Sequence, residues 1–500
     1  TMSMLLAGVA LAATLSTLIE APQAQNDYLH DHLTKLEVNY EKVWKSSALK
    51  LPEQDRLKIA KIITRLNNPA SSQGLDKTLT GQALSTSLYD VCRIEQEDCT
   101  KSIRLNRSLS EDHLNDDNRV VNVKETSVRI VFDLHSDPSK ISLAGIFDET
   151  RILSFYQTQA GWIQNGTKII AKTPNLYGSH DRNFAAQFSD GFVGLNYYPA
   201  SASWRDFWVE FPIDEIKFDI EKAKRLNVNS LRIFLTHDYF DNIETREDAL
   251  EKLQTFLDLC QENDIHVLLT LFDLRPDYAL SNWNVDIAHI DYVLGKVAAH
   301  KAVMGVDLKN QPDLDFENWG EGLVEAWLTV MARHIQSNYS NLAVTTGWSK
   351  AENAARLSDV FDIITYHEYQ NPESFGQRLN EVIEQVGDKP VMITELGSTI
   401  WHPPFVKGYT ETAQASRLQN QVSHAERADG VFVWTLNDFE HVGNEVVGPL
   451  PWRKAQQRHF GLIRPDGSLR PAADILKSFG ARSSLELTHA KIKKSNTTQN

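Results

Sequence analysis

Eight short runs of apolar and β-branched residues recur about every forty residues between positions 192 and 438, with amphipathic helical segments between them. The runs are FVGLNYYP, NSLRIFL, HVLLTLFD, VMGVDLKN, LAVTTGW, FDIITYHEY, PVMITELG and GVFVWTLND. Strands alternating with helices are typical of a parallel sheet with crossover helices. Eight units over about 290 residues fit a barrel of about 250 residues better than an open sheet. We therefore expect an α/β fold, with a (β/α)8 TIM barrel over residues 191–482.

The amino-terminal segment differs from the rest in composition. Met4–Ile19 carries no charge and is followed by small residues near Ala24, although no basic residue precedes it. This pattern predicts a signal peptide or membrane anchor over residues 1–25, and hence an exported protein, whether periplasmic, extracellular or membrane-anchored. In an oxidising compartment, Cys92 and Cys99 could close a small loop, or they could remain two free thiols.

Three further segments complete the expected organisation. Apolar residues at three- and four-residue spacing predict a helical amino-terminal region over 28–120. Short alternating runs then predict a small β-sandwich-like module over 121–190, which could bind sugar or pack against its neighbour. Residues 483–500 form a polar tail, and Cys260 in an apolar helical stretch is expected to be a small buried hydrophobe.

Charge and motifs exclude several classes of function. The chain has 51 basic and 66 acidic residues, and its net charge of −15 repels phosphate backbones, so we expect no nucleic-acid partner. No Gly-x-Gly-x-x-Gly or Walker loop follows the first strand. No His-Glu-x-x-His motif or Cys/His cluster occurs either, so we expect neither a cofactor nor a metal site.

Polar side chains interrupt the apolar runs where the barrel strands should end. In such barrels the working residues emerge at the carboxyl ends of the strands. Glu395 follows four apolar or β-branched residues, so we expect its carboxylate to point into the mouth of the barrel. The polar and aromatic residues at these positions are Arg232, Asn310, Gln311, His367, Tyr369, Glu395, Trp434 and Asn437.

Four of these strand-end motifs carry a family resemblance. PVMITELG, DLKNQPDLDF, HEY and FVWTLNDF, in order on the expected strands, together resemble clan A glycoside hydrolases, and family 5, the cellulase-like branch, is closest. The resemblance covers residues 191–480. It implies that Glu395 is the nucleophile and that Asn310 holds the sugar 2-hydroxyl. It also implies that His367 and Tyr369 line the substrate subsite and orient the nucleophile or the substrate.

The chemistry of retention explains why such residues would be needed. A retaining double displacement requires two carboxyl groups about 5 to 5.5 Å apart, one to attack and one to shuttle the proton. Arg232 would help keep Glu395 ionised. Trp434 matches the aromatic platform of the family, on which a sugar ring can stack. Trp327, inside an amphipathic helix, is expected to belong to the core.

One position departs from the family pattern. The acid/base position holds Gln311, whose amide can neither donate nor recover a carboxyl proton. Three explanations remain open: an engineered isosteric replacement, a natural loss that leaves a sugar-binding protein, and an enzyme whose proton shuttle is another residue. The carboxylates that could lie close enough to substitute are Asp313, Asp315, Glu317 and Glu368.

These observations predict a glycoside hydrolase that cleaves O-glycosidic bonds of a β-linked polysaccharide or oligosaccharide with retention. A membrane tether would run through the amino-terminal segment. Two other functions remain open: a non-catalytic glycan-binding or scaffold protein, and a polysaccharide transglycosylase.

Overall fold

The chain folds into two compact units, seen in a computed structural model. The structure describes residues 98–114, 119–135, 142–174, 182–188, 191–275, 278, 282–404 and 406–481, together with scattered positions between 52 and 63. The predicted signal or anchor segment Met4–Ile19, Cys92, the Cys99 side chain and the tail 483–500 lie outside the described residues. Within the described part of the chain, every helix is too short or too polar to span a lipid bilayer.

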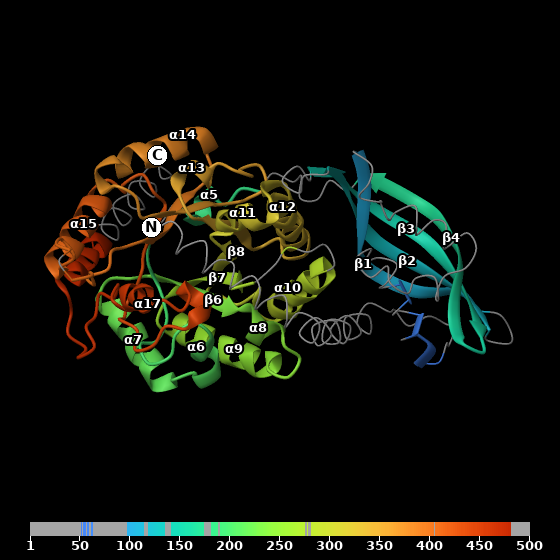
Figure 1. Ribbon diagram of the computed structural model, residues 1–500, viewed down its shortest axis with the longest axis horizontal. Helices are drawn as coiled ribbons and strands as arrows, with labels where there is room; N and C mark the ends of the chain where they lie inside the picture. Colours follow the sequence, from blue (N-terminus) through green and yellow to red (C-terminus); the bar gives the residue numbers. More distant parts are fainter. Residues whose placement is uncertain are drawn as a thin grey trace, which may run out of the picture. The chain divides into compact units, whose positions relative to one another are not determined.

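The larger unit is a closed barrel of eight parallel strands (Figure 1). Each strand pairs with its neighbour in chain order, and the last strand pairs with the first. The strands are β5 (Phe192–Asn196), β6 (Ser230–Thr236), β7 (His266–Asp273), β8 (Val303–Asn310), β9 (Ala343–Trp348), β10 (Ile364–Glu368), β11 (Val391–Leu396) and β12 (Gly430–Val433). All eight coincide with the predicted runs, so the predicted (β/α)8 barrel is confirmed.

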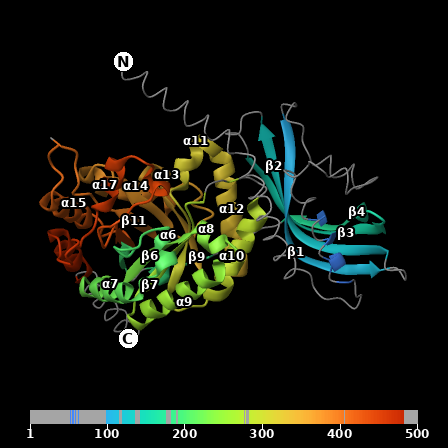
Figure 2. The ribbon, with the colours of Figure 1, turned by 60° about the horizontal axis from the view of Figure 1, so that its bottom comes forward.

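Helices surround these strands, as the two ribbon views show (Figure 1, Figure 2). The labelled helices of this unit are α5 (Ala185–Phe188), α6 (Arg205–Glu210), α7 (Ile213–Arg225), α8 (His237–Asp241), α9 (Arg246–Glu262), α10 (Trp283–Val297), α11 (Phe316–Trp319), α12 (Glu321–Asn338), α13 (Ala351–Ala354), α14 (Phe375–Val386), α15 (Glu411–Ser423), α16 (Asn444–Val447) and α17 (Pro451–Arg458). Two 3-10 turns, η5 (Pro312–Asp315) and η6 (Pro372–Ser374), follow β8 and β10, and residues 471–481 are helical.

Burial on both faces explains why the barrel strands are nearly continuous apolar runs. Helices cover the outer face and side chains fill the interior, so almost every strand position is buried. Gly194 on β5 shows how tight the interior is, because a Cβ there would lie 2.2 Å from the ring of Phe432 on β12. On α12, Trp327 is fully buried, which confirms its prediction as a core residue. Cys260 on α9 is buried as well.

The smaller unit contains a four-stranded antiparallel sheet in the order β1-β2-β3-β4. Its strands are β1 (Asp98–Leu114), β2 (Val120–His135), β3 (Ser142–Thr158) and β4 (Gly161–Pro174). Ile59, Ile62 and Ile63 from the preceding helical segment pack against apolar side chains of β2, β3 and β4. A single sheet faced by a helix therefore provides the core of this unit among its described residues.

This unit differs from the prediction in two ways. The helical region expected over 28–120 is wrong for residues 98–114, which form the long strand β1. Residues 121–135 and 142–174 form part of one sheet rather than a sandwich, and residues 182–188, which include α5, belong to the barrel unit. β1 pairs with β2 along nearly its whole length. This long-range pairing stabilises the strand, and the polar sequence of residues 98–114 has no local pattern that predicts it.

Candidate active site

A buried arginine organises the interior of the barrel near the carboxyl ends of its strands. Arg232 on β6 is fully buried and donates from Nη1 to Glu395 Oε1 at 2.8 Å and to Asn196 Oδ1 at 3.0 Å. Its Nε and Nη2 both donate to Asp307 Oδ2, at 2.9 and 2.6 Å. Nη2 also donates to Asn310 Oδ1 at 2.9 Å. One guanidinium therefore connects side chains from β5, β8 and β11.

The carboxylate of Glu395 is held from both sides. Its Oε1 accepts from Arg232, and its Oε2 accepts from the Tyr369 hydroxyl at 3.0 Å. His367 Nδ1 lies 3.4 Å from Oε2, because the Cα atoms of His367 and Glu395 are register partners on β10 and β11. Burial raises the pKa of Glu395 above the ordinary 4.5, while Arg232 and the Tyr369 hydroxyl act in the opposite direction. The glutamate predicted at the end of the seventh barrel strand thus lies in a buried, charged site.

Gln311 lies beside the same histidine. Its Nε2 is 2.9 Å from His367 Nδ1, and its backbone N–H donates to Gly347 O at 2.8 Å, in a left-handed turn with φ of 49°. Gln311 Nε2 and Glu395 Oε2 both contact the one imidazole nitrogen, so they are at most about 6.3 Å apart. That upper limit lies below the range of about 6.5 to 9.5 Å that separates the two carboxyl groups of inverting glycosidases.

His367 is buried. Burial and the nearby Arg232 charge hold the pKa of its imidazole well below the ordinary 6.5. Its Nε2 is buried without a hydrogen-bond partner in the structure and packs against Gly347, where a Cβ would lie only 2.8 Å away. A glycine on β9 therefore makes room for the imidazole, whose Nδ1 faces both Gln311 and Glu395.

Two residues of this network were not among the sequence candidates. Asp307 on β8 is completely buried and binds Arg232, the Gly347 backbone N–H at 3.0 Å and the Thr270 hydroxyl at 3.3 Å. Asn196 ends β5 and donates from Nδ2 to Thr394 O at 2.9 Å. Asn196 could have been predicted, because it is a polar residue at the carboxyl end of the run FVGLN, where the working residues of such barrels lie. Asp307 could have been recognised because it is a charged residue inside the apolar run of β8.

The remaining strand-end candidates occupy the same end of the barrel. Trp434 follows β12, is 6% exposed, and lies in an aromatic cluster with Trp204, Tyr198 and Phe439, with ring centroids 6.1 to 6.4 Å from its own. Asn437 does not join the arginine network, because its Nδ2 donates to Asp219 at 2.7 Å. It braces the loop after β12 against α7.

Of the four carboxylates suggested as substitutes for Gln311, three are engaged elsewhere. Glu368 forms an ion pair with Arg378 on α14, at 2.7 Å. Asp313 accepts hydrogen bonds from Ser349 and Asn353 in the β9–α13 segment. Asp315 lies 3.5 Å from the ammonium of Lys309. The fourth, Glu317, is exposed on α11. Among the described residues, no group of three or more His, Cys, Asp and Glu side chains is arranged to hold a metal ion.

Replacing Arg232 by methionine is expected to destabilise the protein strongly. The substitution leaves Asp307 and Glu395 buried beside each other without their cation, and breaking a buried ion pair costs about 3 to 5 kcal/mol. The unfolding free energy, measured by denaturant titration, should fall by that amount. Arg205→Met is the matched control, because the Arg205–Asp238 pair is exposed and should contribute less than about 1 kcal/mol. Equal losses in the two variants would contradict this account.

The chain was compared with known proteins. No protein-family model and no curated protein matches it. Among solved structures, it is similar to a GH5_18 protein from Streptomyces cattleya in complex with Manb1-4GlcNAc, with 15% identity, a TM-score of 0.46, and coverage of 58% of this chain and 80% of the other. It is similar to a GH5_18 protein from Bifidobacterium longum subsp. infantis, with 14% identity, a TM-score of 0.48, and coverage of 58% and 79%. A third is the exo-beta-1,4-mannosidase from Opitutaceae bacterium strain TAV5, with 19% identity, a TM-score of 0.49, and coverage of 63% of each chain. These are likenesses of fold.

Proposed function

We propose that this protein is a glycoside hydrolase that cleaves a β-linked polysaccharide or oligosaccharide by a retaining double displacement. The observation that carries the proposal is that Gln311 and Glu395 both contact His367 Nδ1, which keeps them closer together than the two carboxyl groups of an inverting glycosidase. Glu395 is the nucleophile. Its carboxylate is aligned by Arg232 and Tyr369, so that it is already oriented when a sugar arrives.

Asn310 is suited to bind the sugar hydroxyl next to the anomeric carbon. Its Oδ1 accepts from Arg232, which fixes the orientation of the amide and leaves Nδ2 available to donate. Asn310 ends β8, immediately before Gln311. A hydrogen bond to the 2-hydroxyl that strengthens in the transition state would lower the barrier by several kcal/mol.

Exposed aromatic and apolar side chains in the segments that follow the barrel strands favour an extended substrate. Tyr369, Tyr409, Leu450 and Trp452 are 37%, 41%, 36% and 54% exposed and belong to the segments that follow β10, β11 and β12. Connections after barrel strands lie at the carboxyl face, and aromatic rings stack on the C–H faces of pyranoses. Several sugar units beyond the one at Glu395 could therefore find contacts on this face.

The stereochemistry of the product tests the proposal. An aryl β-glucoside and an aryl β-mannoside with a 2,4-dinitrophenol leaving group are followed by proton NMR from the first minutes of reaction. The β-anomer is expected to appear first and to mutarotate afterwards. If the α-anomer appears first, the mechanism is inverting and the proposed roles are wrong.

The pH dependence of kcat/KM should report the environment of Glu395. Because its pKa in the folded protein lies above 4.5, the ionised nucleophile is lost at a higher pH than for an exposed glutamate as pH falls. The acidic limb for a 2,4-dinitrophenyl glycoside is therefore expected above pH 4.5. Tyr369→Phe removes a hydrogen bond that lowers this pKa, so the limb should move further up. A limb below 4.5 would count against this assignment.

A second candidate function is supported by Gln311 itself. With an amide at the acid/base position, the barrel could bind glycans without cleaving them. Calorimetric binding of β-glucan and β-mannan oligomers, with no turnover by either the natural chain or Gln311→Glu, would favour this candidate.

A further inference from the structure

We propose that Asp273 serves as the general acid and base of this site, in the role that Gln311 cannot perform. This inference rests on the proposed glycosidase function and concerns which side chain moves the proton. Asp273 was not among the carboxylates suggested by the sequence.

Asp273 has the right place in the fold. It is the last residue of β7, at the carboxyl end of the barrel, and β7 pairs directly with β8, the strand that leads to Gln311. Its Cα is the register partner of Thr236 on β6, the strand that carries Arg232. The side chain is only 3% exposed.

The carboxyl group is not committed to a structural contact. Its one hydrogen bond among the described residues is a long one, from the Tyr198 hydroxyl to Oδ2 at 3.4 Å. The other oxygen, Oδ1, accepts no hydrogen bond from the residues that the structure describes, and it is not completely buried. Oδ1 therefore reaches accessible space. Asp307, the neighbouring buried aspartate, is instead held by Arg232, Gly347 and Thr270.

The charges around Asp273 suit a group that exchanges its proton. Burial raises the pKa of its carboxyl from 3.8 to about 6, and Glu395 acts in the same direction. The cations Lys309 on β8 and Arg232 on β6 oppose the rise, as does the Tyr198 hydroxyl. A carboxyl that titrates near the working pH can both give and recover a proton, which is what this role requires.

The proposed reaction has two displacement steps. Glu395 attacks the anomeric carbon, the bond to the leaving oxygen breaks, and that oxygen takes the proton of the Asp273 carboxyl. In the second step the Asp273 carboxylate takes a proton from water, the water oxygen bonds to the anomeric carbon, and the ester bond to Glu395 breaks. Both carboxyl groups return to their starting states.

The test compares leaving groups in the Asp273→Asn variant. For substrates that need protonation, such as 4-methoxyphenyl glycosides or oligosaccharides, kcat/KM should fall by about 10² to 10⁴. For 2,4-dinitrophenyl glycosides, kcat/KM should change little and kcat should fall, with a burst of phenolate. Added azide should restore turnover and yield a β-glycosyl azide. In the Gln311→Glu background, the same substitution should lose most of its effect.

Asp219→Asn is the matched control. Asp219 is also a buried aspartate, its pKa is also raised to about 6 by burial, and it is also hydrogen-bonded by a tyrosine, Tyr197 at 3.2 Å. It lies on α7 and contacts none of the residues of the arginine network in the described structure. Its replacement should leave the dependence on leaving group unchanged.

A further variant keeps the inference testable if Asp273→Asn does not fold. Tyr198→Phe preserves the ring and removes the hydrogen bond that lowers the pKa of Asp273, so the basic limb of kcat/KM should move to higher pH. An unmoved limb would overturn the inference.

Three other results would also overturn it. The first is an equal loss of kcat/KM for all leaving groups in Asp273→Asn, as expected if Asp273 only binds a sugar hydroxyl. The second is no loss of kcat/KM in that variant. The third is turnover by Gln311→Glu while the natural chain is inactive. Absence of turnover in both the natural chain and Gln311→Glu would instead end the proposed glycosidase function.

Discussion

Replacing Glu395 by glutamine is expected to lower kcat on every glycoside by about 10⁴-fold or more. The amide has the shape of the carboxylate, but it cannot form the glycosyl ester on which both steps depend. Its oxygen can still accept from Arg232 or Tyr369, so the fold should be retained. Steady-state rates with 2,4-dinitrophenyl glycosides, alongside the far-ultraviolet circular dichroism of the variant, measure both expectations.

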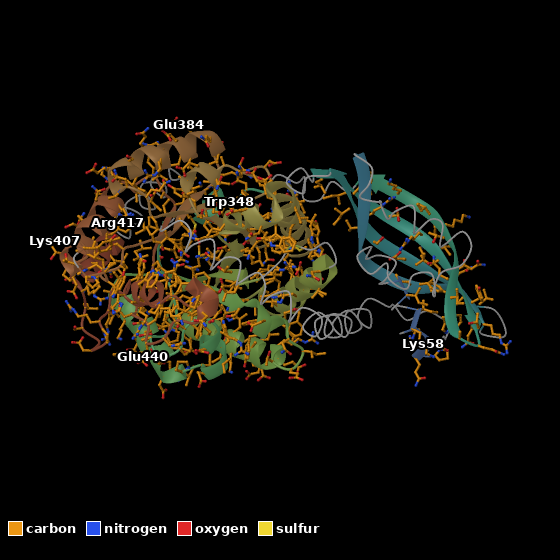
Figure 3. All side chains as sticks on the ribbon, viewed as in Figure 1. Lys58, Trp348, Glu384, Lys407, Arg417 and Glu440 are labelled. Atoms are coloured by element: carbon orange, nitrogen blue, oxygen red, sulfur yellow. The ribbon has the colours of Figure 1, made fainter. Side chains whose placement is uncertain are left out.

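Glu384→Gln provides the control for this substitution. Glu384 is exposed on α14 and lies at the outer edge of the barrel unit, as does Lys407 in the segment before α15 (Figure 3). Its replacement should leave kcat unchanged. If Glu395→Gln kept a kcat within tenfold of the natural chain, Glu395 would not be the nucleophile.

Replacing Gln311 by glutamate in the Asp273→Asn variant is expected to raise turnover of substrates with poor leaving groups by about 10² or more, because a carboxyl group at position 311 would take over the proton transfer. The new carboxyl would lie next to His367 Nδ1, at most about 6.3 Å from the Glu395 carboxylate and so closer than the pair of an inverting glycosidase. Two carboxylates at this distance repel each other, which favours the protonated form of one of them. Initial rates on β-linked oligosaccharides, compared with rates on 2,4-dinitrophenyl glycosides, measure the gain.

Gln377→Glu is the matched control for this change, since Gln377 is exposed on α14. It introduces the same charge and should alter neither rate. If Gln311→Glu left the rates of the Asp273→Asn variant unchanged on all substrates, a carboxyl group at position 311 could not transfer the proton.

The barrel was predictable because its strands are distinctive. Strands buried on both faces must be nearly continuous apolar runs, and a polar residue such as Glu395 within such a run stands out. Parallel strands also bring their carboxyl ends to one side, so Arg232, Asn310 and His367 could be expected near it. The strand β1 could not be recognised in this way. Residues 98–114 are rich in charged and hydroxyl side chains, and they become a strand through long-range pairing with β2.

The linear pattern of residues is enough to establish eight strand–helix units, the barrel they close into and the end at which polar groups gather, because periodicity and burial are local properties. It cannot give distances between side chains on different strands. Only the tertiary structure determines that Gln311 and Glu395 contact the same imidazole nitrogen and that Asp307 binds Arg232. It also determines that Asp273 accepts a hydrogen bond from Tyr198 through only one of its two carboxyl oxygens. Those relations depend on strand register and on the direction of each side chain inside the barrel, which arise when segments far apart in the chain pack together.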